Sequence, residues 1–198
     1  MTGVQTCALP IFFAAEGQPL ASDLPQLRYD AASAPKRALE NALNYPPHLA
    51  PVRLIGLFSS QASPAYLLWS EAKTAGSVFA KEEFFADTSE VAITQWLADV
   101  LSGYYPGMLD ALYAETGAFA VAAADALADL GRDDLAVFSA GTDADVADKL
   151  SPILICVVGI NQADAGTRCF TEAQKLLSGE PAQSGTLPPD SLWYAASP

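Results

Sequence analysis

Small polar and acidic residues recur in this sequence where apolar, strand-like segments end. The candidates are Ser60, Glu115, Thr116, Gly141, Asp143 and Asn161. In an open parallel sheet, ligands bind beyond the carboxyl ends of the strands, where helix N-termini also present free N–H groups. Helix capping alone would explain most of these Ser, Thr and Asp residues taken singly. Taken together, they predict a polar cleft that binds a ligand through hydrogen bonds.

Motifs for covalent chemistry or cofactor binding are absent from the sequence. It contains no G-x-G-x-x-G, no G-x-x-x-x-G-K-[ST] and no G-x-S-x-G pattern. The single histidine, His48, lies in a Pro-rich loop, and the acidic run at 143–148 lacks the Gly and distal Glu of an EF-hand loop. Cys156 and Cys169 read as small buried hydrophobes. We therefore predict no catalytic residue, no metal site and no cofactor.

Alternating strand and helix signals would position the polar residues. Strands are predicted at 53–59, 77–86, 110–115, 135–141 and 153–160. Helices are predicted at 34–44, 117–130, 143–150 and 163–178. Two more are predicted, one that Ser63–Pro64 starts and Gly76 ends, and one that an Asp87–Glu90 capping box starts and Gly103 ends. Near-continuous apolar strands that alternate with helices indicate an α/β fold with a doubly wound parallel sheet of about five strands and flanking helices.

The amino-acid composition argues against one class of partner, nucleic acids. Hydrophobic residues make up 51% of the 198-residue chain, which is typical of a globular protein. There are 10 basic and 23 acidic residues, for a net charge of −13. The basic stripes that nucleic-acid binding requires are missing, since Lys36–Arg37 is the one short cluster of positive charge. We expect no nucleic-acid partner.

The first eleven residues are interpreted as foreign to the protein. Residues 7–15 resemble the apolar part of a signal peptide, but no Lys or Arg precedes Arg28. Read from a GTG start codon, a common sequencing-library adapter translates to Met1–Ile11 without a mismatch. We therefore expect native sequence to begin near Phe12, within a longer gene, and any signal peptide to be absent from this piece.

The order of the motifs resembles one known family. The stretch "YYPGMLDALYAETGAFAVAAADALADLGRDDLAVFSAGTD" is similar to the second half of type 1 periplasmic solute-binding proteins of the ribose and simple-sugar group, including a Gly-[Arg/Lys]-x-Asp motif. "ILICVVGINQADAGTRCFTEAQKLLSGEP" resembles the strand and long helix that follow, and the likeness covers about residues 27–181.

The resemblance implies two lobes joined by three chain crossings, with ligand bound between them. Residues 12–32 would be a remnant of the first lobe and a crossing, 33–160 the α/β second lobe, 161–181 a helix returning to the largely missing first lobe, and 182–198 a crossing and tail.

Carried over by motif, the family's ligand-contacting positions fall near Pro64–Tyr66, Thr116–Gly117, Gly141 with Asp143 two residues on, and Ile160–Asn161. The family's own side chains are replaced at most of these positions.

The resemblance implies a substrate-binding component of an ABC-type uptake or sensing system that binds a small polar, sugar-like solute and catalyses no reaction. Its partners would be the solute and a membrane permease, and the intact protein would be extracytoplasmic, either periplasmic or lipid-anchored. The alternative is the effector-binding domain of a LacI-like transcription regulator. The region upstream of Phe12 in the native gene would distinguish the two.

Overall fold

The computed structural model describes residues 12–15, 26–45, 52–76, 78–86, 89–141 and 144–195, which belong to two compact units. Unit 1 comprises Met1–Ala31 and Ile160–Pro188, and unit 2 comprises Ala32–Gly159 and Pro189–Pro198. The adapter-like residues 1–11, His48 and Asp143 lie outside the described residues.

Unit 2 is built on a six-stranded sheet in the order β4-β3-β5-β6-β7-β9. The strands are β3 (Val52–Phe58), β4 (Val78–Phe84), β5 (Ala111–Ala114), β6 (Ala136–Ala140), β7 (Leu154–Gly159) and β9 (Asp190–Trp193). The first five run parallel, as predicted, and β9 pairs antiparallel with β7. The sequence indicated only a possible short extended piece near β9, because an exposed four-residue edge strand carries little apolar pattern.

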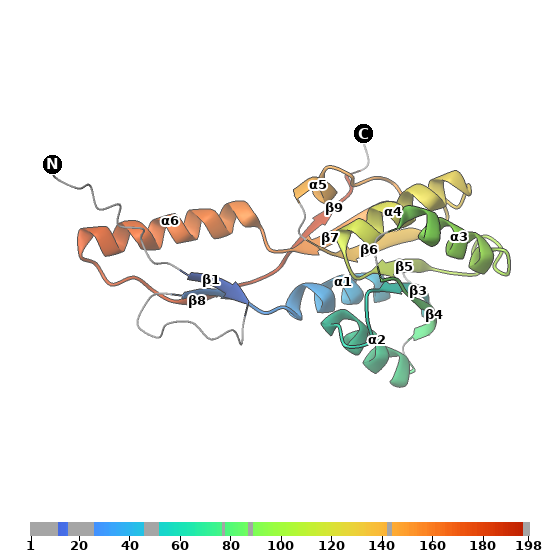
Figure 1. Cartoon of the computed structure of the whole chain (residues 1–198), viewed down its shortest axis with the longest axis horizontal. Coiled ribbons are helices and arrows are strands. Elements are labelled where there is room, and N and C mark those ends of the chain that lie inside the picture. The colour runs from blue at the N-terminus through green and yellow to red at the C-terminus, as the bar shows by residue number, and fades with distance from the viewer. Residues whose placement is uncertain are drawn as a thin grey trace. The chain divides into compact units, whose positions relative to one another are not determined.

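Helices cover both faces of this sheet (Figure 1), which confirms the doubly wound α/β prediction. They are α1 (Ser33–Leu43), α2 (Pro64–Thr74), α3 (Glu90–Leu101), α4 (Gly117–Asp129) and the short α5 (Ala144–Ala147). One core lies under α1 and α2 and includes Trp69, which is fully buried. The other lies under α3, α4 and α5 and includes Leu97 and Phe119. Among the described residues, no helix is long and apolar enough to cross a membrane.

Helix starts follow the predicted chemistry in part. Ser63 caps α2, its hydroxyl accepting from the N–H of Tyr66 at 3.1 Å, with Pro64 as the first helical residue. The predicted Asp87–Glu90 capping box is not what starts α3, because Ser89 is the N-cap there and Glu90 is already helical. The helix predicted at 143–150 is shorter than expected, since α5 ends at Ala147.

The Gly-Arg-x-Asp motif closes the edge of the sheet where the parallel strands begin. Gly131, at φ +65°, ends α4 in a conformation that glycine adopts without strain. Arg132 is buried and pairs through two nitrogens with Asp134, at 2.7 and 3.1 Å. Arg132 also donates to the Tyr104 carbonyl at 2.9 Å, and Asp134 accepts from the N–H of Gly107 at 3.0 Å. The motif therefore ties the loop after α3 to the loop before β6.

A second ion pair holds the same edge one strand away. The backbone N–H and the guanidinium of Arg53, at the start of β3, both donate to the Asp110 carboxylate that precedes β5. The N–H of Asp110 returns a bond to the Arg53 carbonyl at 2.8 Å. The starts of β3 and β5 are thereby fixed relative to each other.

Unit 1 contains a parallel three-stranded sheet and one long helix. The sheet order is β1 (Phe12–Ala15), β2 (Gln26–Tyr29) and β8 (Gly185–Leu187), and the helix is α6 (Gln162–Ser178). Gly179 ends α6 at φ +78°, as the sequence predicts. Phe170 and Leu177 on α6 are 65% and 71% exposed, which is unusual for large apolar side chains on an amphipathic helix.

We predict that Asp134→Asn lowers the free energy of unfolding by about 2 kcal/mol, because it leaves the buried Arg132 guanidinium without its charged partner. Urea denaturation at neutral pH measures the change. The control is Asp133→Asn, which alters an exposed neighbour and should change stability by less than about 0.5 kcal/mol.

The same pair predicts a pH dependence. The hydrogen bonds from Arg132 outweigh partial burial and lower the pKa of Asp134. Its stabilising contribution is therefore complete above the ordinary aspartate pKa of about 3.9 and is lost as the pH falls through the lowered value. Wild type and Asp134→Asn should converge in stability at acid pH, and a gap that widened on acidification would contradict the assignment.

Candidate functional site

The predicted polar edge forms in unit 2, at the carboxyl ends of β3, β5 and β6. The N–H of Glu115 donates to the Leu57 carbonyl at 2.9 Å, and the N–H of Gly141 donates to the Val158 carbonyl at 3.0 Å. These bonds extend the strand ladders by one residue. Because β3, β5 and β6 are neighbours in the sheet, Ser60, Glu115, Thr116 and Gly141 come to the same edge.

The carboxylate of Glu115 is held in place at this edge by Ser59. It accepts from the backbone N–H of Ser59 at 2.6 Å and from the Ser59 hydroxyl, which lies 3.0 and 3.1 Å from its two oxygens. The carboxylate is partly exposed, and Ser59 is exposed. The sequence placed Ser59 at the end of its strand, but only the structure reveals that it is the partner of Glu115.

Thr116 and Gly141 shape the edge through the backbone of α4. The Thr116 hydroxyl accepts from the N–H of Phe119 at 3.2 Å, so its capping role is real. A Cβ on Gly141 would overlap the backbone nitrogen of Gly117 and lie 3.0 Å from its Cα. A Cβ on Gly117 would in turn lie 2.5 Å from a methyl group of Val146. The end of β6 packs against the start of α4, and the start of α4 packs against α5. Neither Gly141 nor Gly117 has space for a side chain.

Ser60 and Tyr66 are placed differently from each other. Ser60 is exposed, and its hydroxyl accepts from the N–H of Ala62 at 3.2 Å, which organises the turn before α2. Tyr66 packs edge-on against Phe58 and Phe84, and its hydroxyl lies 3.3 Å from Glu82 on β4. A ligand role for either side chain stays a prediction.

Glu82 is an acceptor that the sequence analysis missed. Besides Tyr66, it accepts from the indole N–H of Trp69 at 2.7 Å and from the ammonium of Lys73 at 2.9 Å. Partial burial alone would raise the pKa of Glu82, but the hydrogen bonds and the charge of Lys73 outweigh it and lower that pKa. No local sequence pattern links Glu82 to these donors, which come from α2.

The remaining candidates, Asn161 and Asp143, lie outside the described part of unit 2. Asn161 belongs to unit 1 and caps α6, accepting from the N–H groups of Ala163 and Asp164 at 3.1 and 3.2 Å. Asp143 lies outside the described residues. Cys156 is a free, buried thiol whose pKa burial raises to about 11, and it accepts from the amide of Asn41 at 3.4 Å. Within the described part of the chain, no three His, Cys, Asp or Glu residues could hold a metal ion.

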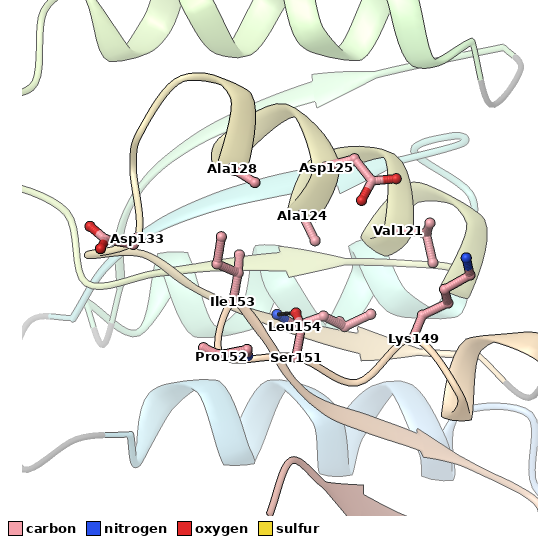
Figure 2. Close-up of a pocket in the computed structure, with 10 residues that line it drawn as sticks. All are labelled: Val121, Ala124, Asp125, Ala128, Asp133, Lys149, Ser151, Pro152, Ile153 and Leu154. Carbon is pink, nitrogen blue, oxygen red and sulfur yellow. Dashed lines mark hydrogen bonds between the residues drawn. The ribbon is translucent and has the colours of Figure 1, made fainter. Parts of the chain in front are cut away.

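A groove of about 520 Å³ lies elsewhere in unit 2, beside α4. Figure 2 shows the α4 side chains of Val121, Ala124 and Ala128 on one side and the segment 151–154 on the other. That segment leads into the start of β7, so the groove belongs to the opposite end of the strands from the polar edge. It lies beside the crossover in which α5 is only four residues long.

Comparison with known proteins yields structural likeness only. No family model and no curated protein sequence matches the chain. Its fold is similar to solute-binding proteins of ABC transporters. One is from Agrobacterium vitis with bound allitol, with TM-score 0.60, 16% identity, and coverage of 85% of this chain and 62% of that one. Another is from Bradyrhizobium with bound Bis-Tris, with TM-score 0.67, 12% identity, and 89% and 54% coverage.

A third similar structure is the 5-methylthioribose transporter solute-binding protein from Thermotoga lettingae, in complex with 5-methylthioribose. It gives TM-score 0.57, 15% identity, and 92% and 60% coverage. The chain therefore spans less than two thirds of each of these three structures. At such identities the likeness confirms the periplasmic-binding-protein-like fold.

We predict that Gly141→Ala lowers the free energy of unfolding by about 2 kcal/mol, because the new methyl group meets backbone atoms of Gly117 that cannot move aside locally. Thermal or urea unfolding measures the change. Gly103→Ala is the control, since its Cβ would make only an ordinary 3.6 Å contact. Equal effects of the two substitutions would show that the close approach at Gly141 is not a packing constraint.

We also predict that the fluorescence of Trp69 reports the protonation of Glu82. In a Trp96→Phe, Trp193→Phe background, the emission should titrate with a midpoint below the ordinary glutamate pKa of about 4.3, because the pKa of Glu82 is lowered. The Glu82→Gln substitution should abolish this titration. Far-UV circular dichroism checks that the transition precedes acid unfolding, and a midpoint above 4.3 would contradict the proposed hydrogen bonds.

Proposed function

We propose that this chain is part of the substrate-binding component of an ABC-type uptake or sensing system. It would bind a small polar, sugar-like solute at the carboxyl edge of the unit 2 sheet, without catalysis. The observation that carries the proposal is the oriented Ser59–Glu115 pair at this edge, on a fold similar to solute-binding proteins.

The chemistry of the edge supports a hydroxylated solute. Sugar and polyol hydroxyl groups both donate and accept hydrogen bonds. The edge offers the acceptor oxygens of Glu115 and the exposed hydroxyls of Ser59 and Ser60. Similar proteins carry allitol and 5-methylthioribose, which are solutes of this kind. The ribose and simple-sugar group remains the proposed subgroup.

Further parts of the proposal concern the intact protein. Its partners would be the solute and a membrane permease, and it would act outside the cytoplasm. Unit 2 would be the second lobe of a two-lobed receptor. Unit 1 would hold the parts of the first lobe that this piece retains, including the helix that begins after Asn161. The coverage of 54–62% of three similar structures supports the view that a longer protein performs the function.

The proposal is tested by nuclear magnetic resonance on the full 198-residue chain. Titration with allitol or sorbitol at millimolar concentration should shift the backbone amides of Ser59, Ser60, Glu115, Thr116 and Gly141. We expect millimolar affinity, because one edge contributes only part of the enclosure that small-molecule sites use. Absence of shifts at this edge, or shifts confined to the groove beside α4, would refute the proposed site.

A further inference from the structure

We propose that Glu115 sets a charge preference at this site, so that it selects a small hydroxylated ligand bearing an ammonium group over neutral or anionic ligands of the same shape. This inference rests on the proposed function and goes beyond it, because it concerns which polar solute is bound. Three observations support it, and each concerns the Glu115 carboxylate.

The first observation is that Glu115 is fixed in place while part of its hydrogen-bonding capacity remains unused. A carboxylate offers about four lone-pair sites. The backbone N–H of Ser59 occupies one of them, and the Ser59 hydroxyl, which has a single hydrogen to donate, lies 3.0 and 3.1 Å from the two oxygens. The remaining sites are available to donors on a ligand, and the carboxylate is partly exposed.

The second observation is that Glu115 differs in pairing from the other carboxylates that organise unit 2. Asp110 pairs with Arg53, Glu82 with Lys73, and Asp134 with Arg132. In the described part of the chain, no lysine or arginine forms an ion pair with Glu115.

One cation on α1, Arg37, is engaged away from β5. The guanidinium of Arg37 donates to the carbonyl of Pro189 at 2.9 Å, just before β9. In the sheet order β9 stands three strands from β5, which corresponds to roughly 14 Å. Salt screens exposed charges over about 8–10 Å, so this cation contributes little to the field at Glu115.

The third observation concerns the helix that begins beside Glu115. The N-terminus of α4 would by itself favour an anion. However, the Thr116 hydroxyl already occupies the N–H of Phe119, and the full negative charge of Glu115 immediately precedes this cap. The unit charge of the carboxylate exceeds the partial charge of a helix end, which is about half an elementary charge. At the start of α4, the balance between these two charges is therefore negative.

Ligand binding makes the unpaired charge decisive. A ligand that covers the carboxylate removes water from it. The loss of hydration costs binding free energy unless the ligand supplies a partner for the charge. A ligand ammonium replaces the water with a charge-assisted hydrogen bond, a hydroxyl group does so only in part, and a ligand carboxylate adds repulsion. The expected order of affinity is ammonium, then neutral, then anion.

Three ligands with the same six-carbon chain test this order on the full 198-residue protein. They are glucamine, which carries an ammonium group, neutral sorbitol, and anionic gluconate. Dissociation constants come from amide shifts at the edge, at neutral pH and low ionic strength. We expect glucamine to bind about tenfold more tightly than sorbitol and gluconate to bind more weakly than sorbitol, with the glucamine preference shrinking as salt is added.

Two matched variants separate the local charge from the total charge. Glu115→Gln should bring the affinities for glucamine and sorbitol within about twofold of each other. Asp125→Asn changes the net charge equally, on an exposed residue eight positions along α4 from Gly117 and about 12 Å away, and should keep the preference.

Failure of this inference is distinguishable from failure of the proposed function. If sorbitol shifts the edge amides and glucamine binds no more tightly, the charge preference is refuted and the polyol site stands. The same conclusion follows if Asp125→Asn abolishes the preference as fully as Glu115→Gln does. If none of the three ligands shifts the edge amides, the proposed site itself is refuted, and the inference fails with it.

Discussion

Parallel strand pairing is the constraint on which the rest of unit 2 depends. Two parallel neighbours cannot be joined by a hairpin, so the chain must cross over a face of the sheet before each next strand. Five strands are joined in this way. The crossovers supply α2 to one face and α3, α4 and α5 to the other, and α1, which precedes β3, completes the first face. A necessary result is that all five strands end at one edge and all begin at the other. The residues at one edge can therefore differ in role from those at the other, and the proposed binding site lies at the edge where the strands end.

The two edges differ in how their charges are satisfied. Where the strands begin, Arg53 with Asp110 and Arg132 with Asp134 join neighbouring loops through several hydrogen bonds each. Where they end, the contacts are capping bonds and close backbone approaches, and the principal carboxylate is held by a serine. Ion pairs that leave no unpaired charge favour rigidity, whereas an oriented group with free lone pairs can still bind a ligand.

Much of this fold could be predicted from the sequence because its strands are buried on both faces. Segments such as 153–160 are apolar almost without interruption, and the structure places β7 there with one residue removed at each end. Buried parallel strands and Gly-terminated helices leave strong local patterns. The sequence indicated β9 only as a possible short extended piece, and its antiparallel pairing with β7 was not predicted because contacts distant in sequence fix it.

The sequence predicted where the candidate site lies, but not which of its side chains form hydrogen bonds with each other. Strand ends located Ser60, Glu115, Thr116 and Gly141, since edge location follows from topology. Which side chains bond to each other depends on the sheet order, in which β3 lies next to β5. Ser59 and Glu115, 56 positions apart, therefore meet. The Glu82 cluster escaped prediction for a similar reason, since its donors come from α2 and no local pattern links them.

The charge of Glu115 also affects a buried side chain behind the edge. Tyr113, two residues earlier on β5, is fully buried, and its hydroxyl donates to the Pro35 carbonyl at 3.4 Å. Burial raises the pKa of this phenol, and the negative charge of Glu115 raises it further. The tyrosine therefore stays neutral, and it adds no second negative charge behind the edge. Because no described lysine or arginine forms an ion pair with Glu115, the proposed charge preference requires the neutralising cation to come from the ligand.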